Sequence, residues 1–98
     1  MGHQGYFVID RVPILHGPNY ALWKLRLEAY FIFLDEDVFL SLEYNTYDES
    51  NEKAKKIILK TLLYHDVSIV KHCKTAKEIM ENVHSMYGRE GFQDSIFF

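Results

Sequence analysis

The side chains best able to do chemistry in this chain are its single cysteine, Cys73, and its five histidines. A histidine beside a thiol can activate it as a nucleophile, and closely spaced histidines and cysteines bind zinc. The sequence contains no His-x-x-x-His or Cys-x-x-Cys spacing, and a break expected near Asp66 separates His65 from His72. We therefore expect no metal site and a half-buried thiol without a catalytic role. The histidines are His3, His16, His65, His72 and His84.

Two other patterns could serve catalysis or phosphate binding. The acidic run Asp35, Glu36 and Asp37 could supply a general acid, but carboxylates also stabilise the positive amino end of a helix, which is our interpretation. The chain has five glycines, and none lies in a strand-to-helix phosphate loop. We predict a protein that is not an enzyme, with no catalytic residues, no metal and no cofactor.

The length and charge of the chain restrict its class. Ninety-eight residues are enough for one small domain, so we expect a single unit over residues 1–98. The net charge of −3 and the dispersed basic residues disfavour direct binding of nucleic acid, which needs concentrated positive charge. One cysteine allows no internal disulfide and fits a reducing compartment. The apolar runs are far shorter than the roughly 20 residues of a membrane span, so we expect a soluble, cytoplasmic protein without a membrane partner.

Aromatic residues make up 15% of the chain, which is a high share for its size. A small core cannot easily hide that much large apolar surface, so some of it is expected to meet a partner. We assign this role to aromatic residues of the amino-terminal segment, the first helix and the tail. The candidate interface residues are Tyr6, Phe7, Phe31, Phe92, Phe97 and Phe98.

The hydrophobic pattern predicts an all-α domain of about five helices in a small orthogonal bundle. An extended strap of β-branched and aromatic residues occupies residues 1–18, because Pro13 argues against a helix there. The helical bundle occupies residues 19–88. A tail without hydrophobic period follows over residues 89–98.

The first helix is predicted over about residues 20–34 and is apolar on more than one side. Its main apolar stripe consists of Trp23, Leu27, Tyr30 and Leu34, and Leu22, Leu25 and Phe33 widen it. Because the polar remainder is thin, we expect two faces of this helix to be covered. The aromatic residues at helical spacing are interpreted as core rather than as a ligand site.

Capping residues place the later helices. A short helix follows the acidic run, and Thr46 and Glu49 have the spacing of a capping box that opens a helix to about residue 64. A break near Asp66 precedes another short helix. The last helix should begin after Thr75 and end at Gly88 as a left-handed cap.

Two short motifs carry the most specific pattern in the chain. In the first, over residues 15–23, Gly17 ends the strap, Asn19 can cap a new helix, and Tyr20 and Trp23 share one helical face. In the second, Thr75-Ala76-Lys77-Glu78-Ile79, the first and fourth residues form a capping box. The structural motif residues are Leu15, Gly17, Asn19, Tyr20, Trp23, Thr75, Ala76, Glu78 and Ile79.

Together the motifs resemble the amino-terminal part of the Gag polyprotein of copia-type LTR retrotransposons, which reads Leu-x-Gly-x-Asn-Tyr-x-x-Trp and, downstream, Thr-Ala-x-Glu-Ile. The resemblance covers residues 12–88. The family pattern has tryptophan where this chain has Tyr47 and Met80, and an acidic residue where it has Asn51. The resemblance implies a helical, retroviral-capsid-like domain that works by self-association. Its implied partner is itself, as a dimer or larger homo-oligomer, or a related Gag protein.

A second function class is open, because the chain ends before the further helices and basic region that follow in that family. It could be a host-recruited interaction module that regulates a partner or interferes with capsid assembly. Mixing it with a full-length relative would separate the two: abortive coassembly supports interference, and indifference points to another partner. A third class is a small-ligand carrier, which would require a dry, preformed internal cavity.

Overall fold

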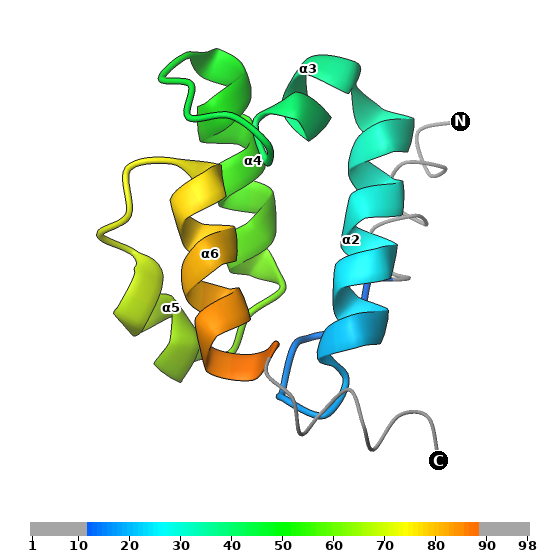
Figure 1. Ribbon diagram of the computed structural model, residues 1–98, viewed down its shortest axis with the longest axis vertical. Helices are drawn as coiled ribbons and strands as arrows, with labels where there is room; N and C mark the ends of the chain where they lie inside the picture. Colours follow the sequence, from blue (N-terminus) through cyan, green and yellow to red (C-terminus); the bar gives the residue numbers. More distant parts are fainter. Residues whose placement is uncertain (1–11, 89–98) are drawn as a thin grey trace.

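The computed structural model describes residues 12–88, and within this range the chain is all-α, as predicted. Helix α2 packs on α3, α3 packs on α4, and both α4 and α5 pack on α6. In Figure 1, α2 lies along one side of the molecule, α4, α5 and α6 lie on the other, and α3 joins them at one end. The helices are α2 (Tyr20–Leu34), α3 (Glu36–Leu40), α4 (Glu49–Lys60), α5 (Tyr64–Val70) and α6 (Ala76–Tyr87).

The described part of the strap, residues 12–18, is extended and lies against the end of α4. The backbone N–H of Leu15 donates to the carbonyl of Thr61 at 2.8 Å, and Leu15 forms an isolated parallel bridge with Leu62. Gly17 then turns the chain into α2 with a φ of 107°, a conformation that L side chains rarely adopt. The strap therefore crosses the helices without building a sheet.

Helix α2 has the predicted bounds, but its cap differs from the prediction. Asn19 occupies the N-cap position, yet its side chain makes no capping bond. Instead, its Oδ1 accepts from the N–H of His16 at 3.0 Å and its Nδ2 donates to the carbonyl of Ile14 at 3.0 Å. Asn19 therefore stabilises the turn of the strap. Its side chain bonds to the nearby backbone of the strap and not to the free N–H groups of the helix.

Helix α4 begins and ends differently from its prediction. The capping residue is Asp48, whose carboxylate accepts from the N–H of Asn51 at 3.1 Å. Thr46 does not cap, because its hydroxyl lies 3.5 Å from that of Ser41. The helix ends at Lys60, and Thr61 and Leu62 are buried beyond its end.

The last two helices include two further corrections. The break after α4 falls before Tyr64, so Asp66 lies inside the first turn of α5. Helix α6 ends at Gly88 as predicted, but the φ of Gly88 is −87° rather than left-handed. Lack of space explains the glycine, because a Cβ at this position would clash with the imidazole of His84 and lie only 2.9 Å from its carbonyl oxygen.

The core lies between α2 and the pair α4 and α6. Trp23 is fully buried, and its Nε1–H donates to the hydroxyl of Thr61 at 2.9 Å, so the large ring also leaves no polar atom unpaired. The core cluster that contains Trp23 draws buried side chains from the strap and from each of the described helices. The largest fully buried apolar side chains are Trp23, Phe31, Leu15, Leu27, Ile58, Ile79, Val38, Val70 and Val83.

Candidate functional site

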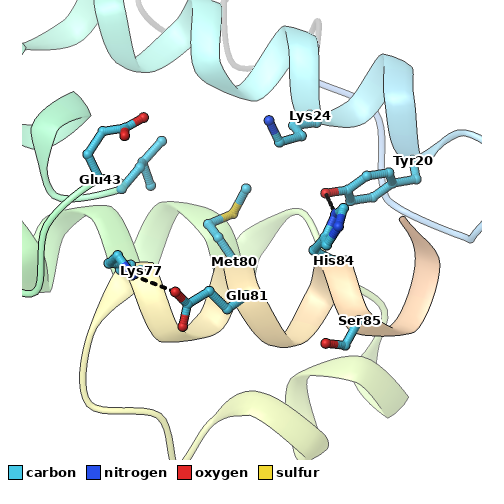
Figure 2. Close-up of a pocket in the computed structure, with 9 residues that line it drawn as sticks. Tyr20, Lys24, Glu43, Lys77, Met80, Glu81, His84 and Ser85 are labelled. Atoms are coloured by element: carbon cyan, nitrogen blue, oxygen red, sulfur yellow. Dashed lines mark hydrogen bonds and ion pairs between the residues drawn. The ribbon is translucent and has the colours of Figure 1, made fainter. Parts of the chain in front are cut away.

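The first motif joins the strap to α2 and contributes one wall of a surface groove between α2 and α6. Leu15, Tyr20 and Trp23 are buried, so most of this motif serves the core. The hydroxyl of Tyr20 lies 3.2 Å from Nδ1 of His84, at the groove's edge (Figure 2). Burial raises the pKa of the Tyr20 phenol, which favours its protonated, hydrogen-bonding form.

The groove itself has a volume of about 510 Å³ and is open to solvent. Figure 2 shows Met80 in its floor, with charged side chains around it, including an ion pair between Lys77 and Glu81. A carrier of apolar ligands needs an enclosed, dry cavity, which this open and charged groove is not. Its lining residues are Tyr20, Lys24, Leu42, Glu43, Lys77, Met80, Glu81, His84 and Ser85.

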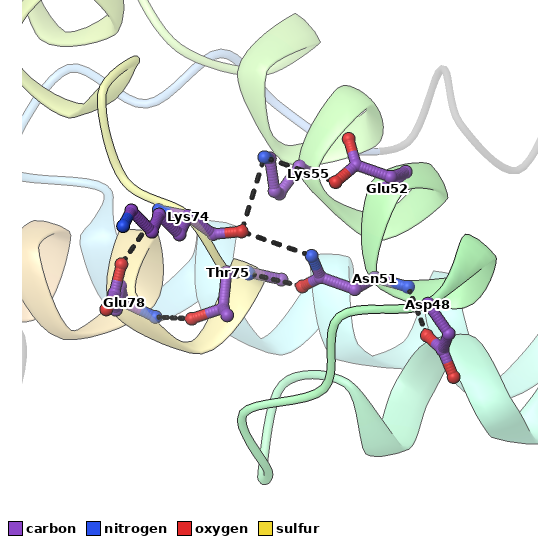
Figure 3. Close-up of polar contacts among 8 residues, drawn as sticks. Asp48, Asn51, Glu52, Lys55, Lys74, Thr75 and Glu78 are labelled. Atoms are coloured by element: carbon purple, nitrogen blue, oxygen red, sulfur yellow. Dashed lines mark hydrogen bonds and ion pairs between the residues drawn. The ribbon is translucent and has the colours of Figure 1, made fainter.

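The second motif anchors the amino end of α6 to that of α4, as Figure 3 shows. The side chain of Asn51 is fully buried between them; its Oδ1 accepts from the N–H of Ala76 at 2.8 Å, and its Nδ2 donates to the carbonyl of Lys74 at 3.2 Å. A single amide therefore satisfies a donor and an acceptor of the α6 turn. Sequence reasoning did not find this role of Asn51, because its partners lie more than twenty residues away.

The capping box of the second motif is present in a modified form. The hydroxyl of Thr75 accepts from the N–H of Glu78 at 3.1 Å, as predicted. The carboxylate of Glu78 reaches past the N-cap to the N–H of Lys74 at 2.8 Å. Thr75 is fully buried and also donates to Oδ1 of Asn45 at 2.7 Å, so it ties the loop before α4 to α6.

Of the predicted interface residues, Phe31 is the one that lies within the described range, and the structure contradicts its role. Phe31 is fully buried in the core, on the inner side of α2. The residues Tyr6, Phe7, Phe92, Phe97 and Phe98 lie outside the described residues. The prediction for Phe31 was wrong because α2 is apolar nearly all round, so spacing alone did not tell which side faces the core.

The outer face of α2 instead carries a group of exposed apolar side chains. They are Leu22, Leu25, Ala29, Ile32 and Phe33, which we call the α2 seam, and the exposed Arg26 lies beside them. The four larger side chains are exposed to 45%, 64%, 62% and 59%, in chain order. Leu22, Leu25 and Phe33, which were expected to widen the buried stripe, are therefore exposed on the other side of the helix.

The thiol of Cys73 and the acidic side chains of residues 12–88 do not gather into a cluster that could hold a metal ion. Cys73 is buried, and burial followed by the negative charge of Glu78 raises its thiol pKa, which keeps it protonated and weakly nucleophilic. Within residues 12–88, no three His, Cys, Asp or Glu side chains gather as metal ligands would. No helix in this range combines the length and apolar character needed to cross a bilayer.

A buried acidic contact joins α5 to the end of α6. Asp66 is almost fully buried, and both of its carboxylate oxygens lie near the hydroxyl of Tyr87, at 2.8 and 2.9 Å. Burial, with the hydrogen bond to Asp66 and its negative charge, raises the pKa of Tyr87 to about 12. The ring of Tyr87 also lies beside Gly17, so this residue connects the strap, α5 and α6.

This contact predicts a loss of stability at high pH. An unfolded tyrosine ionises near pH 10, whereas folded Tyr87 keeps its proton to about pH 12, so the folded state binds more protons between these values. The contribution is complete below pH 10, and the free energy of unfolding falls as the pH rises toward 12. Denaturation by urea at several pH values checks this: Tyr87→Phe should flatten the alkaline decline.

The control for this prediction is Tyr64→Phe, because Tyr64 is 85% exposed. It should leave the alkaline decline as it is in the unmodified chain. Burial of Tyr20 acts in the same direction as that of Tyr87, so the difference between variant and unmodified chain isolates Tyr87. Equal declines in all three proteins would contradict the assigned role of the Asp66 contact.

Comparisons with models of known protein families, with curated proteins and with solved structures found no match to this chain. The all-α fold therefore rests on the structure, and the resemblance to copia-type Gag rests on the two sequence motifs.

Proposed function

We propose that this chain is a non-enzymatic, Gag-like domain that associates with copies of itself, or with a related Gag protein, in the cytoplasm. The single observation that carries the proposal is the α2 seam, a row of uncharged side chains on the outer face of a helix whose opposite face is in the core. An association domain requires an exposed apolar surface such as the seam, whereas a catalytic or carrier domain does not. The two motifs support the seam, because they fix the amino ends of α2 and α6.

The size of the seam indicates a weak contact. Helix α2 has 15 residues and is therefore about 22 Å long. One such helix offers less than the roughly 800 Å² per partner of a standard stable interface. Fully burying a Leu, Ile or Phe side chain yields about 1.5 to 3 kcal/mol, but ordering and association offset much of that gain. A contact of this strength forms at high concentration or when symmetry repeats it, as in a shell.

The variant Leu25→Asp tests the proposal. A carboxylate in the middle of the seam would be desolvated on association at a cost of several kcal/mol, so the dissociation constant should rise at least about tenfold. Sedimentation equilibrium measures this constant directly. Because Leu25 is 64% exposed, the fold itself should change little in stability.

The matched control is Tyr64→Asp, which places the same charge at a more exposed aromatic site on α5. This variant should associate like the unmodified chain. If both aspartate variants weakened association equally, net charge and not the seam would be responsible. If neither aspartate variant weakened association, the proposed surface would be wrong. If the chain stayed monomeric but coassembled with a full-length relative, it would be an interference module instead.

A further inference from the structure

The spacing of the α2 seam fits a second helix of the same kind. Leu22, Leu25, Ala29 and Ile32 follow one another at intervals of three and four residues, which is the a and d spacing of paired helices. Phe33 lies beside this row, four residues after Ala29 and therefore next to it on the helical surface. A second copy of α2 presents the same spacing, so its side chains can enter the gaps between these residues.

The smallest residue of the seam lies near its middle. Ala29 is exposed and is flanked by larger side chains on both sides, Leu22 and Leu25 before it and Ile32 and Phe33 after it. Two helices approach most closely where their side chains are small. In a twofold pair, the residue at the axis faces its own copy, so Ala29 suits that position.

The charges at the two ends of α2 select the direction of the partner helix. The exposed acidic run Asp35, Glu36 and Asp37 follows the carboxyl end of α2, whereas the first turn of α2 contains no acidic residue. Parallel pairing would bring two acidic runs together. Opposed pairing brings the acidic run of each copy beside the positive amino end of the other copy's helix.

Charge also favours a second copy as the occupant of this particular surface. The chain carries a net charge of −3, so two copies repel each other over most approaches. Helix α2 carries Lys24, Arg26 and Glu28, and Glu28 is paired with Lys24 at 2.9 Å. The five seam residues are uncharged, so two copies can meet there without placing like charges face to face.

Taking these observations together, and building on the proposed function, we infer that two copies pair through their α2 seams in opposite directions, about a twofold axis beside Ala29. This register places Leu25 of one copy opposite Phe33 of the other, since each lies four residues from Ala29. Because the acidic run follows directly after the carboxyl end of α2, the same opposed arrangement brings it toward the partner's amino-terminal turn.

Disulfide cross-linking tests this register in the full chain, with Cys73→Ala as the background so that the buried native thiol does not react. Single cysteines replace Ala29, Leu25 or Phe33, all on the exposed face. A disulfide needs Cβ atoms about 4 Å apart, and the twofold axis brings position 29 of the two copies together. Mild oxidation should therefore link most of the Ala29→Cys chains into dimers. An equal mixture of Leu25→Cys and Phe33→Cys should cross-link several times more than either alone, and Tyr64→Cys should remain monomeric.

Two different failures can be separated, because the mass of each reduced variant is measured on the same samples. If the reduced protein is a dimer but the mixture cross-links no better than its components, the register is overturned while self-association stands. If Leu25→Cys and Phe33→Cys each link strongly to themselves, parallel pairing replaces opposed pairing. If the reduced protein is a monomer at all concentrations and no variant cross-links, the inference and the proposed function both fail.

Discussion

Replacing Trp23 by alanine should lower the free energy of unfolding by about 3 to 5 kcal/mol. Trp23 is fully buried at the centre of the core, and the variant leaves both a cavity and an unpaired acceptor on the hydroxyl of Thr61. Small domains have a total stability of about 5 to 15 kcal/mol, so this loss removes much of it. Thermal and urea denaturation followed by circular dichroism measure the change.

Two controls locate the origin of that effect. Trp23→Phe keeps most of the ring volume and loses the indole N–H, so it should cost clearly less than alanine. Leu25→Ala truncates an exposed residue of the same helix and should change stability by no more than about 0.5 kcal/mol. A Trp23→Ala protein with the melting temperature of the unmodified chain would show that the core has been assigned incorrectly.

Replacing Asn51 by leucine should be the next most damaging change. Leucine has a similar size, but it leaves the N–H of Ala76 without its buried partner, whereas the carbonyl of Lys74 keeps its hydrogen bond from Nζ of Lys55. An orphaned buried N–H costs about 1 to 3 kcal/mol, so the free energy of unfolding should fall by roughly that amount. Urea denaturation is the appropriate measurement, with Asn82→Ala as the control because Asn82 is exposed.

The variant Asn51→Asp separates the two hydrogen bonds. Aspartate keeps the acceptor that faces Ala76 at the positive end of α6, and it loses the donor to the carbonyl of Lys74. Its stability should therefore lie between those of the unmodified chain and Asn51→Leu. If Asn51→Leu were as stable as Asn82→Ala, the anchoring of α6 by this amide would be refuted.

Local features of the sequence predicted α2 and α6 well. The bounds of α2 follow from the Gly17 turn before it and from a largely apolar stretch that lasts until the acidic run. The start of α6 follows from Thr75, whose hydroxyl caps the helix with the expected geometry. In both helices the signal lies within a few residues of the element that it specifies, which is why sequence alone was sufficient.

Other features depend on contacts that no local pattern contains. Thr46 and Asp48 are both good capping residues before α4, and the structure selects Asp48. The spacing of apolar residues on α2 did not show that Phe31 faces the core while Phe33 is exposed, because both sides of this helix are apolar. The role of Asn51 required knowing that two helix ends meet, which is a result of the fold.

The most direct test of the central claim is the absolute mass of the unmodified chain, measured by light scattering after size exclusion over a wide range of concentrations. A single chain has a mass of 11.6 kDa. Self-association through the α2 seam predicts a mass that rises toward twice this value or beyond with concentration and returns to the single-chain value on dilution. A mass that stays at 11.6 kDa even at the highest concentrations reached would contradict the claim.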